Sequence, residues 1–364
     1  MRNNSFVVHP DCAHFRGDVP CVPHKKHGAH CRDCSFYSPQ TRKILIVKLG
    51  AIGDVIRTTP LVRRIRKQFP QAAIWWLTRY PEVLPTAVHR PLPFTLESTL
   101  LAQATDFDML INLDKDAEAC AIASLVRSRE KRGFILKDGK PAPVDENARH
   151  KFITGLFDDV NQNNTKSYPR EIFEICGWNF RGEEYILDVD SSFNWHIPSN
   201  GKPIVGLNTG CGGRWISRLW SEKRWEKLID RLQDDGVFPL LLGGEQEHEK
   251  NTRLAERTGA WYPGHYSLKE FISLVDQCDA VVTGVTMAMH VAIGLKKPLV
   301  LFVNIFNPHE FELYNRGEIL MPRQKCQCFF QPSCSNTEYS CMEHLDVDDV
   351  HSAVARLLKA PVEK

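Results

Sequence analysis

Residues 43–60 read Lys-Ile-Leu-Ile-Val-Lys-Leu-Gly-Ala-Ile-Gly-Asp-Val-Ile-Arg-Thr-Thr-Pro. The apolar run Ile44 to Val47 is short and β-branched, which predicts a strand buried on both faces of a parallel sheet. Gly50 and Gly53 then let the backbone turn tightly into a helix. Asp54 falls in the first turn of that helix, where free N–H groups and the positive end of the helix dipole favour an ionised carboxylate.

An ionised carboxylate at the carboxyl edge of a strand can take a proton from a substrate hydroxyl. Asp54 is therefore the predicted catalytic base. Asp residues also cap helices without any catalytic role, and capping and catalysis are compatible here.

Strands and helices alternate along the rest of the chain. Strand-like runs occur at 43–47, 73–77, 109–113 and 133–136, and helical patterns at 55–68 and 117–126. A turn-rich stretch at 191–203 precedes a second series of strand-like runs at 204–208, 237–242, 280–283 and 299–303. Such alternation predicts crossover units on parallel sheets, and the break at 191–203 predicts two α/β domains.

The segment 43–60 closely resembles the N-terminal signature of glycosyltransferase family 9, the ADP-heptose:lipopolysaccharide heptosyltransferases, and the resemblance extends from about Lys43 to Leu358. It implies the GT-B fold, in which two Rossmann-like doubly wound α/β domains face a cleft. It also implies an inverting, metal-independent transfer with Asp54 as the base. Here a Cys-rich N-terminal extension precedes the two domains.

We expect five parts in the chain. These are a Cys/His-rich extension at 1–40, an acceptor domain at 41–190, a linker at 191–203, a donor domain at 204–345 and a terminal helix at 346–364.

The donor domain contains groups suited to a nucleotide diphosphate. Asn208-Thr-Gly-Cys-Gly-Gly-Arg-Trp215 leaves a strand as a glycine-rich loop whose amides can approach phosphate closely. Glycine loops also form plain turns. The residues expected to contact the donor, several of them from the resemblance alone, are Thr209, Gly210, Arg214, Arg218, Gly244, Glu245, Tyr266, Thr286 and His290.

One position departs from the family pattern. Relatives carry an acid before the helix that bears the histidine, whereas this chain has Val285 between Gly284 and Thr286. The departure implies either a donor other than ADP-heptose or weak turnover.

On the acceptor side, Gly53, Lys115, Lys166 and Tyr168 are the expected contacts, and Lys115 is suited to an anionic glycan. Asp114-Lys-Asp116 is also a D-x-D sequence, the metal motif of another glycosyltransferase fold. Asp54 and the doubled strand–helix pattern favour the metal-independent scheme instead.

Twelve cysteines are many for a chain in a reducing compartment, where clusters suggest metal before disulfides. Cys31 and Cys34 have the two-residue spacing that lets two thiolates reach one tetrahedral ion. We predict that structural zinc or iron is bound by Cys12, Cys21, Cys31 and Cys34, by Cys326, Cys328, Cys334 and Cys341, or by both groups. No catalytic metal is expected, and free thiols are the alternative.

Composition limits the partners. The formal charge is +2 and no basic stripe interleaved with aromatics occurs, which argues against nucleic acid. Without a secretion signal or a membrane-length apolar run, we expect a cytoplasmic protein, peripheral to the inner membrane at most, that can form homo-oligomers.

The leading functional hypothesis is transfer of a heptose or similar sugar from an ADP-sugar to a lipopolysaccharide core or surface glycan. The alternatives are a protein heptosyltransferase of the autotransporter type and a non-catalytic nucleotide-sugar or metal-binding protein on the same scaffold.

Overall fold

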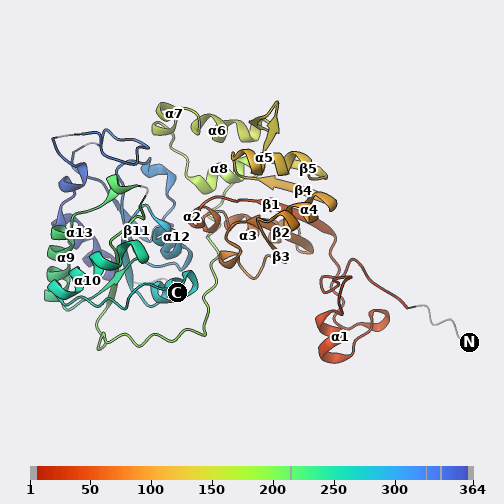
Figure 1. Ribbon diagram of the computed structural model, residues 1–364, viewed down its shortest axis with the longest axis horizontal. Helices are drawn as coiled ribbons and strands as arrows, with labels where there is room; N and C mark the ends of the chain where they lie inside the picture. Colours follow the sequence, from red (N-terminus) through yellow and green to blue (C-terminus); the bar gives the residue numbers. More distant parts are fainter. Residues whose placement is uncertain (1–5, 214, 325, 337, 360–364) are drawn as a thin grey trace, which may run out of the picture. The chain divides into compact units, whose positions relative to one another are not determined.

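The computed structural model describes residues 6–213, 215–324, 326–336 and 338–359 (Figure 1). The chain divides into two compact units. The first unit contains residues 1–50 and 61–148, and the second contains 51–60 and 149–364. The short segment 51–60 thus belongs to the second unit although both of its flanks belong to the first. The domain limits predicted from the sequence stay predictions.

The first unit is built on a six-stranded sheet with the order β3-β2-β1-β4-β5-β6. Its strands are β1 (Arg42–Val47), β2 (Ala72–Thr78), β3 (Arg90–Pro93), β4 (Phe107–Asn112), β5 (Ser128–Lys137) and β6 (Lys140–Pro143). All neighbours are parallel except β5 and β6. The helices α3 (Pro60–Gln68), α4 (Leu96–Ala104) and α5 (Ala117–Leu125) alternate with these strands.

The second unit contains a five-stranded, fully parallel sheet with the order β11-β10-β9-β7-β8. Its strands are β7 (Ile204–Asn208), β8 (Phe238–Leu242), β9 (Ala280–Gly284), β10 (Leu299–Phe302) and β11 (Gly317–Leu320). Its helices are α2 (Ile52–Ile56), α7 (Asp158–Gln162), α8 (Tyr168–Ile175), α9 (Glu222–Asp234), α10 (His248–Thr258), α11 (Leu268–Asp276), α12 (Met287–Gly294) and α13 (Val347–Lys359). The helix α6 (Glu146–Thr154) spans the boundary between the two units. The predicted alternation of strands and helices on parallel sheets is confirmed.

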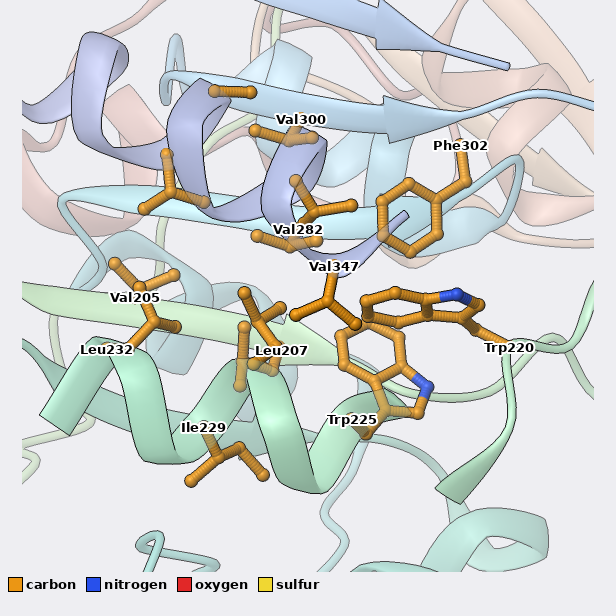
Figure 2. Close-up of a cluster of buried hydrophobic side chains, with 14 of the residues drawn as sticks. Val205, Leu207, Trp220, Trp225, Ile229, Leu232, Val282, Val300, Phe302 and Val347 are labelled. Atoms are coloured by element: carbon orange, nitrogen blue, oxygen red, sulfur yellow. The ribbon is translucent and has the colours of Figure 1, made fainter. Parts of the chain in front are cut away.

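A compact aromatic cluster fixes one face of the second sheet (Figure 2). Trp220 contacts Trp225 edge-on at 5.0 Å between ring centroids, and Phe302 lies 5.2 Å from Trp220. Val347 at the start of α13 packs on the same rings, beside Leu207 of β7. Each aromatic pair contributes about 0.5–1.5 kcal/mol beyond its buried area. This cluster ties α9 and α13 to the sheet whose strand ends carry the donor candidates.

The helix predicted over 55–68 is wrong in one respect, because the structure breaks it into α2 and α3. Pro60 starts the second helix, since proline has no N–H to donate to an earlier turn. The hydroxyls of Thr58 and Thr59 bond to the carbonyls of Asp54 and Ile56, respectively, and occupy acceptors at the break. Asp54 is therefore on a separate helix of only five residues.

The cysteine-rich segment at the start of the chain has little regular structure. It contains α1 (Val22–His27), the short 3-10 helix η1 (Cys31–Asp33) and an isolated bridge between Cys12 and Pro39. Among residues 6–41, Pro23 is the only buried one.

Candidate functional site

The turn before α2 is held by a buried ion pair. Asp114 accepts hydrogen bonds from the backbone N–H groups of Leu49 and Gly50, the latter at 3.1 Å, and pairs with Lys48. Both charged side chains are almost fully buried. Asp114 therefore shapes the turn that leads into α2, a role that the D-x-D sequence did not reveal.

Asp54 stands in the first turn of α2, and its side chain keeps 31% of its surface exposed. Three residues later Arg57 reaches back, with its Nη2 2.8 Å from Asp54 Oδ1. The same guanidinium bonds through Nη1 to Glu310 Oε1 at 2.5 Å. Burial works against the charged form of Arg57, but the two carboxylates outweigh it and raise its pKa well above the usual value.

The aromatic ring of Tyr168 packs against the guanidinium group of Arg57. The guanidinium carbon of Arg57 lies 3.5 Å from the centre of the Tyr168 ring, which is itself buried. The geometry makes Tyr168 a platform for Arg57. Its expected acceptor contact stays a prediction.

Helix α2 crosses α12 at a position where only glycine fits. A Cβ atom on Gly53 would lie 2.3 Å from Cδ2 of His290. Residues 51–60 are also joined to the rest of the second unit by a hydrogen bond from the Ile186 N–H to Thr59 Oγ1 at 2.8 Å. Gly53, expected as an acceptor contact, is thus a point of close helix approach.

His290 is buried beside α2 and stays neutral. Burial, aided by the nearby charge of Arg57, lowers its pKa to about 3, and Asp54 opposes the shift. Its Nδ1 atom is buried without a hydrogen-bond partner, and Tyr185 stacks on the ring at 6.2 Å. A neutral imidazole next to the candidate base adds no competing positive charge.

A polar cluster forms where β7 and β9 end. Asn208 Nδ2 donates to Thr283 Oγ1 at 2.9 Å and to Thr286 Oγ1 at 3.2 Å. Thr286 is the N-cap residue of α12, whose first N–H groups point towards this edge. The next residue, Thr209, donates through its hydroxyl to Asn251 at 2.5 Å. Candidate donor residues from two strand ends are therefore brought together.

The glycine-rich loop after β7 already holds an anion. The carboxylate of Glu247 accepts from the N–H of Gly212 at 3.2 Å and from that of Gly244 at 3.0 Å. A Cβ atom on Gly210 would meet the same side chain at 2.0 Å. The backbone amides of this loop and of Gly244 thus converge on one negatively charged group.

Two cations lie close to the loop. Arg218 is buried, and its Nη2 contacts the Cys211 carbonyl at 3.4 Å. Lys250 donates to the Thr209 carbonyl at 2.8 Å. Burial lowers the pKa of both side chains. Of the other donor candidates, Glu245 is exposed, Tyr266 donates to the Pro263 carbonyl and contacts Trp195, and Arg214 lies outside the described residues.

The two lysines expected at the acceptor have other partners. Lys166 pairs with Glu174 at 2.6 Å, and Lys115 lies 6.0 Å from the centre of the Phe134 ring. Lys166 belongs to the second unit and Lys115 to the first.

The sequence did not single out several residues that the structure places near the candidate base or the glycine-rich loop. Arg57 has a detectable signal, because a cation three residues after Asp54 lies on the same helix face. Its second partner, Glu310, is 253 residues away, so only the fold reveals the pair. Lys250 and Asn208 were likewise not selected.

The cysteine groups are gathered in space. Cys12, Cys21, Cys31 and Cys34 all line one small cavity, and the Sγ atoms of Cys328 and Cys334 are 3.6 Å apart. Among the described residues, no group of three or more His, Cys, Asp or Glu is already arranged to hold a metal ion. No helix within the described ranges is long and apolar enough to cross a membrane.

Comparisons with known proteins give a consistent result. Residues 183–339 match Glycosyltransferase family 9 (heptosyltransferase). The lipopolysaccharide heptosyltransferase 2 of Salmonella typhimurium (strain LT2) is 24% identical over 307 residues, which cover 73% of this chain and 84% of that protein.

Solved structures show the fold. The ADP-heptose lps heptosyltransferase II of Escherichia coli aligns with a TM-score of 0.62 at 17% identity, over 87% of this chain and 98% of that one. The iron-containing dodecameric glycosyltransferase TibC from enterotoxigenic Escherichia coli aligns with a TM-score of 0.55 at 14% identity, over 87% and 76%. The predicted GT-B fold class is confirmed. The chain is a glycosyltransferase, and its residues 183–339 form a segment similar to family 9, the heptosyltransferases.

Proposed function

We propose that this chain is an inverting, metal-independent enzyme that moves a heptose from ADP-heptose to a hydroxyl of a lipopolysaccharide core or related surface glycan. The supporting observation is the contact of α2 with α12 through Gly53 and His290. It puts Asp54 in one compact unit with the N-cap of α12 and the glycine-rich loop.

In the proposed reaction, Asp54 accepts the proton of the acceptor hydroxyl as its oxygen attacks the anomeric carbon. The bond from that carbon to the diphosphate breaks, and ADP leaves with the electron pair. Arg57 and Glu310 are positioning residues that hold the Asp54 carboxylate at the start of α2.

The leaving diphosphate needs neutralisation, which preorganised N–H groups and cations supply. The amides of Gly212 and Gly244 already accommodate the carboxylate of Glu247, which supports their use for phosphate oxygens. We assign Arg218 and Lys250 as the cations, with Thr209, Gly210, Thr286 and His290 around them. Gly244, Glu245 and Tyr266 are the proposed nucleoside contacts.

Val285 bears on the choice of donor. A hydrogen bond from a neutral group to a carboxylate is worth about 1.5–3 kcal/mol, and a valine cannot make it. Asn208, Thr283 and Thr286 present an amide and two hydroxyls at the same strand ends. We propose that these groups contact the donor in place of the acid.

The decisive variant is Asp54→Asn, which keeps the shape of the side chain and removes the base. We expect transfer to fall about 100-fold or more, with ADP affinity unchanged in calorimetry. Asp230→Asn, at an exposed position of α9, is the matched control and should behave as wild type. Transfer by Asp54→Asn at the wild-type rate would refute the base assignment.

A second candidate function is transfer to a protein acceptor. The fold likeness to TibC and the neighbouring thiols of Cys328 and Cys334 favour it. Incubation with labelled donor and both acceptor classes, followed by separation of protein from glycolipid, distinguishes the two functions. The match of residues 183–339 to Glycosyltransferase family 9 favours an enzyme over a purely non-catalytic protein.

The remaining parts of the proposal concern location and metals. We propose that the enzyme works in the cytoplasm at the inner membrane surface. It can form homo-oligomers and does not bind nucleic acid. Cys326, Cys328, Cys334 and Cys341 fit a structural zinc or iron, because thiolates sharing one tetrahedral ion lie about as far apart as Cys328 and Cys334 do.

A further inference from the structure

The N-terminal segment, residues 6–41, lacks the means to hold itself folded. Pro23 is its only buried residue, and α1 and η1 have six and three residues. Its large apolar side chains Phe6, Phe15, Val22 and Phe36 are exposed. A piece of this size cannot bury enough apolar surface to offset its conformational entropy, so small modules of this kind are usually stabilised by disulfides or a metal.

Four cysteines converge in this segment. A cavity of about 30 Å³ is lined by Cys12, Cys21, Cys31 and Cys34, although up to 22 residues of chain separate them. All four thiols are free, so no disulfide supplies the missing support. The cavity has room for one ion.

The backbone brings the cysteines together by specific contacts. Ala13 N–H donates to the Ser38 carbonyl at 2.7 Å, and Gln40 N–H donates to the Asp11 carbonyl at 2.8 Å. These bonds bracket Cys12 and keep it beside residues 38–40, where Cys12 forms an isolated bridge with Pro39. Cys21 is the N-cap residue of α1, and Cys31 opens η1.

Three of the neighbouring histidines already contact other groups. His24 bonds through Nδ1 to the Ala29 carbonyl at 3.0 Å, and His27 stacks on Phe36 at 4.8 Å. His9 and His14 also line the cavity, and His9 packs against Tyr37 at 4.7 Å. The four thiols are the largest set of metal-ligating side chains that line the cavity.

We propose that Cys12, Cys21, Cys31 and Cys34 bind one Zn²⁺ as thiolates and that this ion holds the N-terminal segment folded. On binding, each thiol releases its proton to solvent and its sulfur turns into the cavity to reach about 2.3 Å from the ion. This rotation is needed because the side chains are not yet arranged as a finished metal site. The site is independent of sugar transfer.

Metal analysis of the purified full-length chain tests the proposal. We expect Cys31→Ser to contain one zinc equivalent per chain less than wild type. Cys31→His, which restores a zinc ligand, should recover the metal, and His27→Ala should retain it. Equal metal content in wild type and Cys31→Ser, or iron in place of zinc, would overturn the assignment.

A second measurement, limited proteolysis, uses only the wild-type protein and needs no variant. Chelation of wild type should make residues 6–41 much more sensitive to limited proteolysis, and added Zn²⁺ should restore protection. The same cleavage rate before and after chelation would show that no ion supports this segment.

Discussion

At the scale of single residues, the charges around the candidate base are coupled by one guanidinium. Arg57 bridges Asp54 and Glu310 while lying on Tyr168, and its side chain is only 14% exposed. Removing one member of a buried ionic group leaves an uncompensated charge, whereas removing an opposite pair together costs much less.

We expect Arg57→Met to lower the free energy of unfolding by about 3 kcal/mol, because Glu310 keeps its charge without a partner. Arg57→Met combined with Glu310→Met should recover much of that stability but not the transfer rate, since Asp54 still lacks its positioning contact. Thermal melts and steady-state kinetics measure the two effects. Additive stability losses in the double variant would contradict the coupling.

His290 gives the chain a stability that depends on pH. The pKa of His290 is about 3 in the folded chain, against about 6.5 for an ordinary histidine. The unfolded chain therefore binds the extra proton first, so stability falls as the pH drops below about 6.5. His290 alone accounts for about 2 kcal/mol between pH 7.5 and pH 5.

We expect His290→Gln to show a smaller decrease in melting temperature between pH 7.5 and pH 5 than wild type does. His89, whose pKa burial lowers to about 4, remains in both proteins and cancels in the comparison. His27→Gln, at an exposed position, is the control. An unchanged acid sensitivity in His290→Gln would show that this ring is not the group responsible.

At the scale of helices and strands, sequence patterns found most of the buried strands, including the edge strand β8, and missed the less buried edge strands β3, β6 and β11. The runs at 43–47, 73–77 and 204–208 are mostly apolar, and the structure has β1, β2 and β7 there. β3 contains two prolines and β6 is a short antiparallel edge strand, so neither resembles a buried strand. Apolar runs mark buried strands, and β3 and β6 are mostly exposed or half-buried.

The crossing of α2 and α12 is the element contact most easily tested. Gly53→Ala forces a methyl group against buried His290, and we expect a loss of about 1–3 kcal/mol together with reduced transfer, because α2 carries Asp54. Gly284→Ala, where an added Cβ meets nothing within 4 Å, is the control for stability.

The double variant Gly53→Ala with His290→Ala separates a steric effect from a general loss of helix packing. We expect it to be more stable than the sum of the two single losses predicts, since the smaller side chain makes room for the methyl group. Strictly additive losses in melting experiments would mean that the two positions do not interact.

At the scale of the whole molecule, the fold class followed from the sequence but the membership of one segment did not. The sequence makes Asp54 a candidate base through a local signal, which is a strand, two glycines and a helix start. That residues 51–60 pack with residues 149–364 depends on contacts such as Ile186 to Thr59, which are 127 residues apart. Local patterns contain no information about such partners.

We expect the fragment 149–364 to be less stable than the same fragment joined to residues 51–60 by a flexible linker. Without this segment, His290 and the α12 surface that meets Ile56 lose their cover. The melting temperature should rise by several degrees on fusion, and a scrambled ten-residue segment should give no rise. Equal melting temperatures for the native and scrambled fusions would contradict the assignment of this segment.

The membership of residues 51–60 has an evolutionary consequence. Substitutions, insertions or exchanges confined to residues 61–148 leave α2, with the proposed base Asp54, and the glycine-rich loop after β7 within one compact unit. Under the proposed function, natural variation in residues 61–148 changes the acceptor contacts, while the proposed base and the proposed diphosphate contacts stay within the second unit.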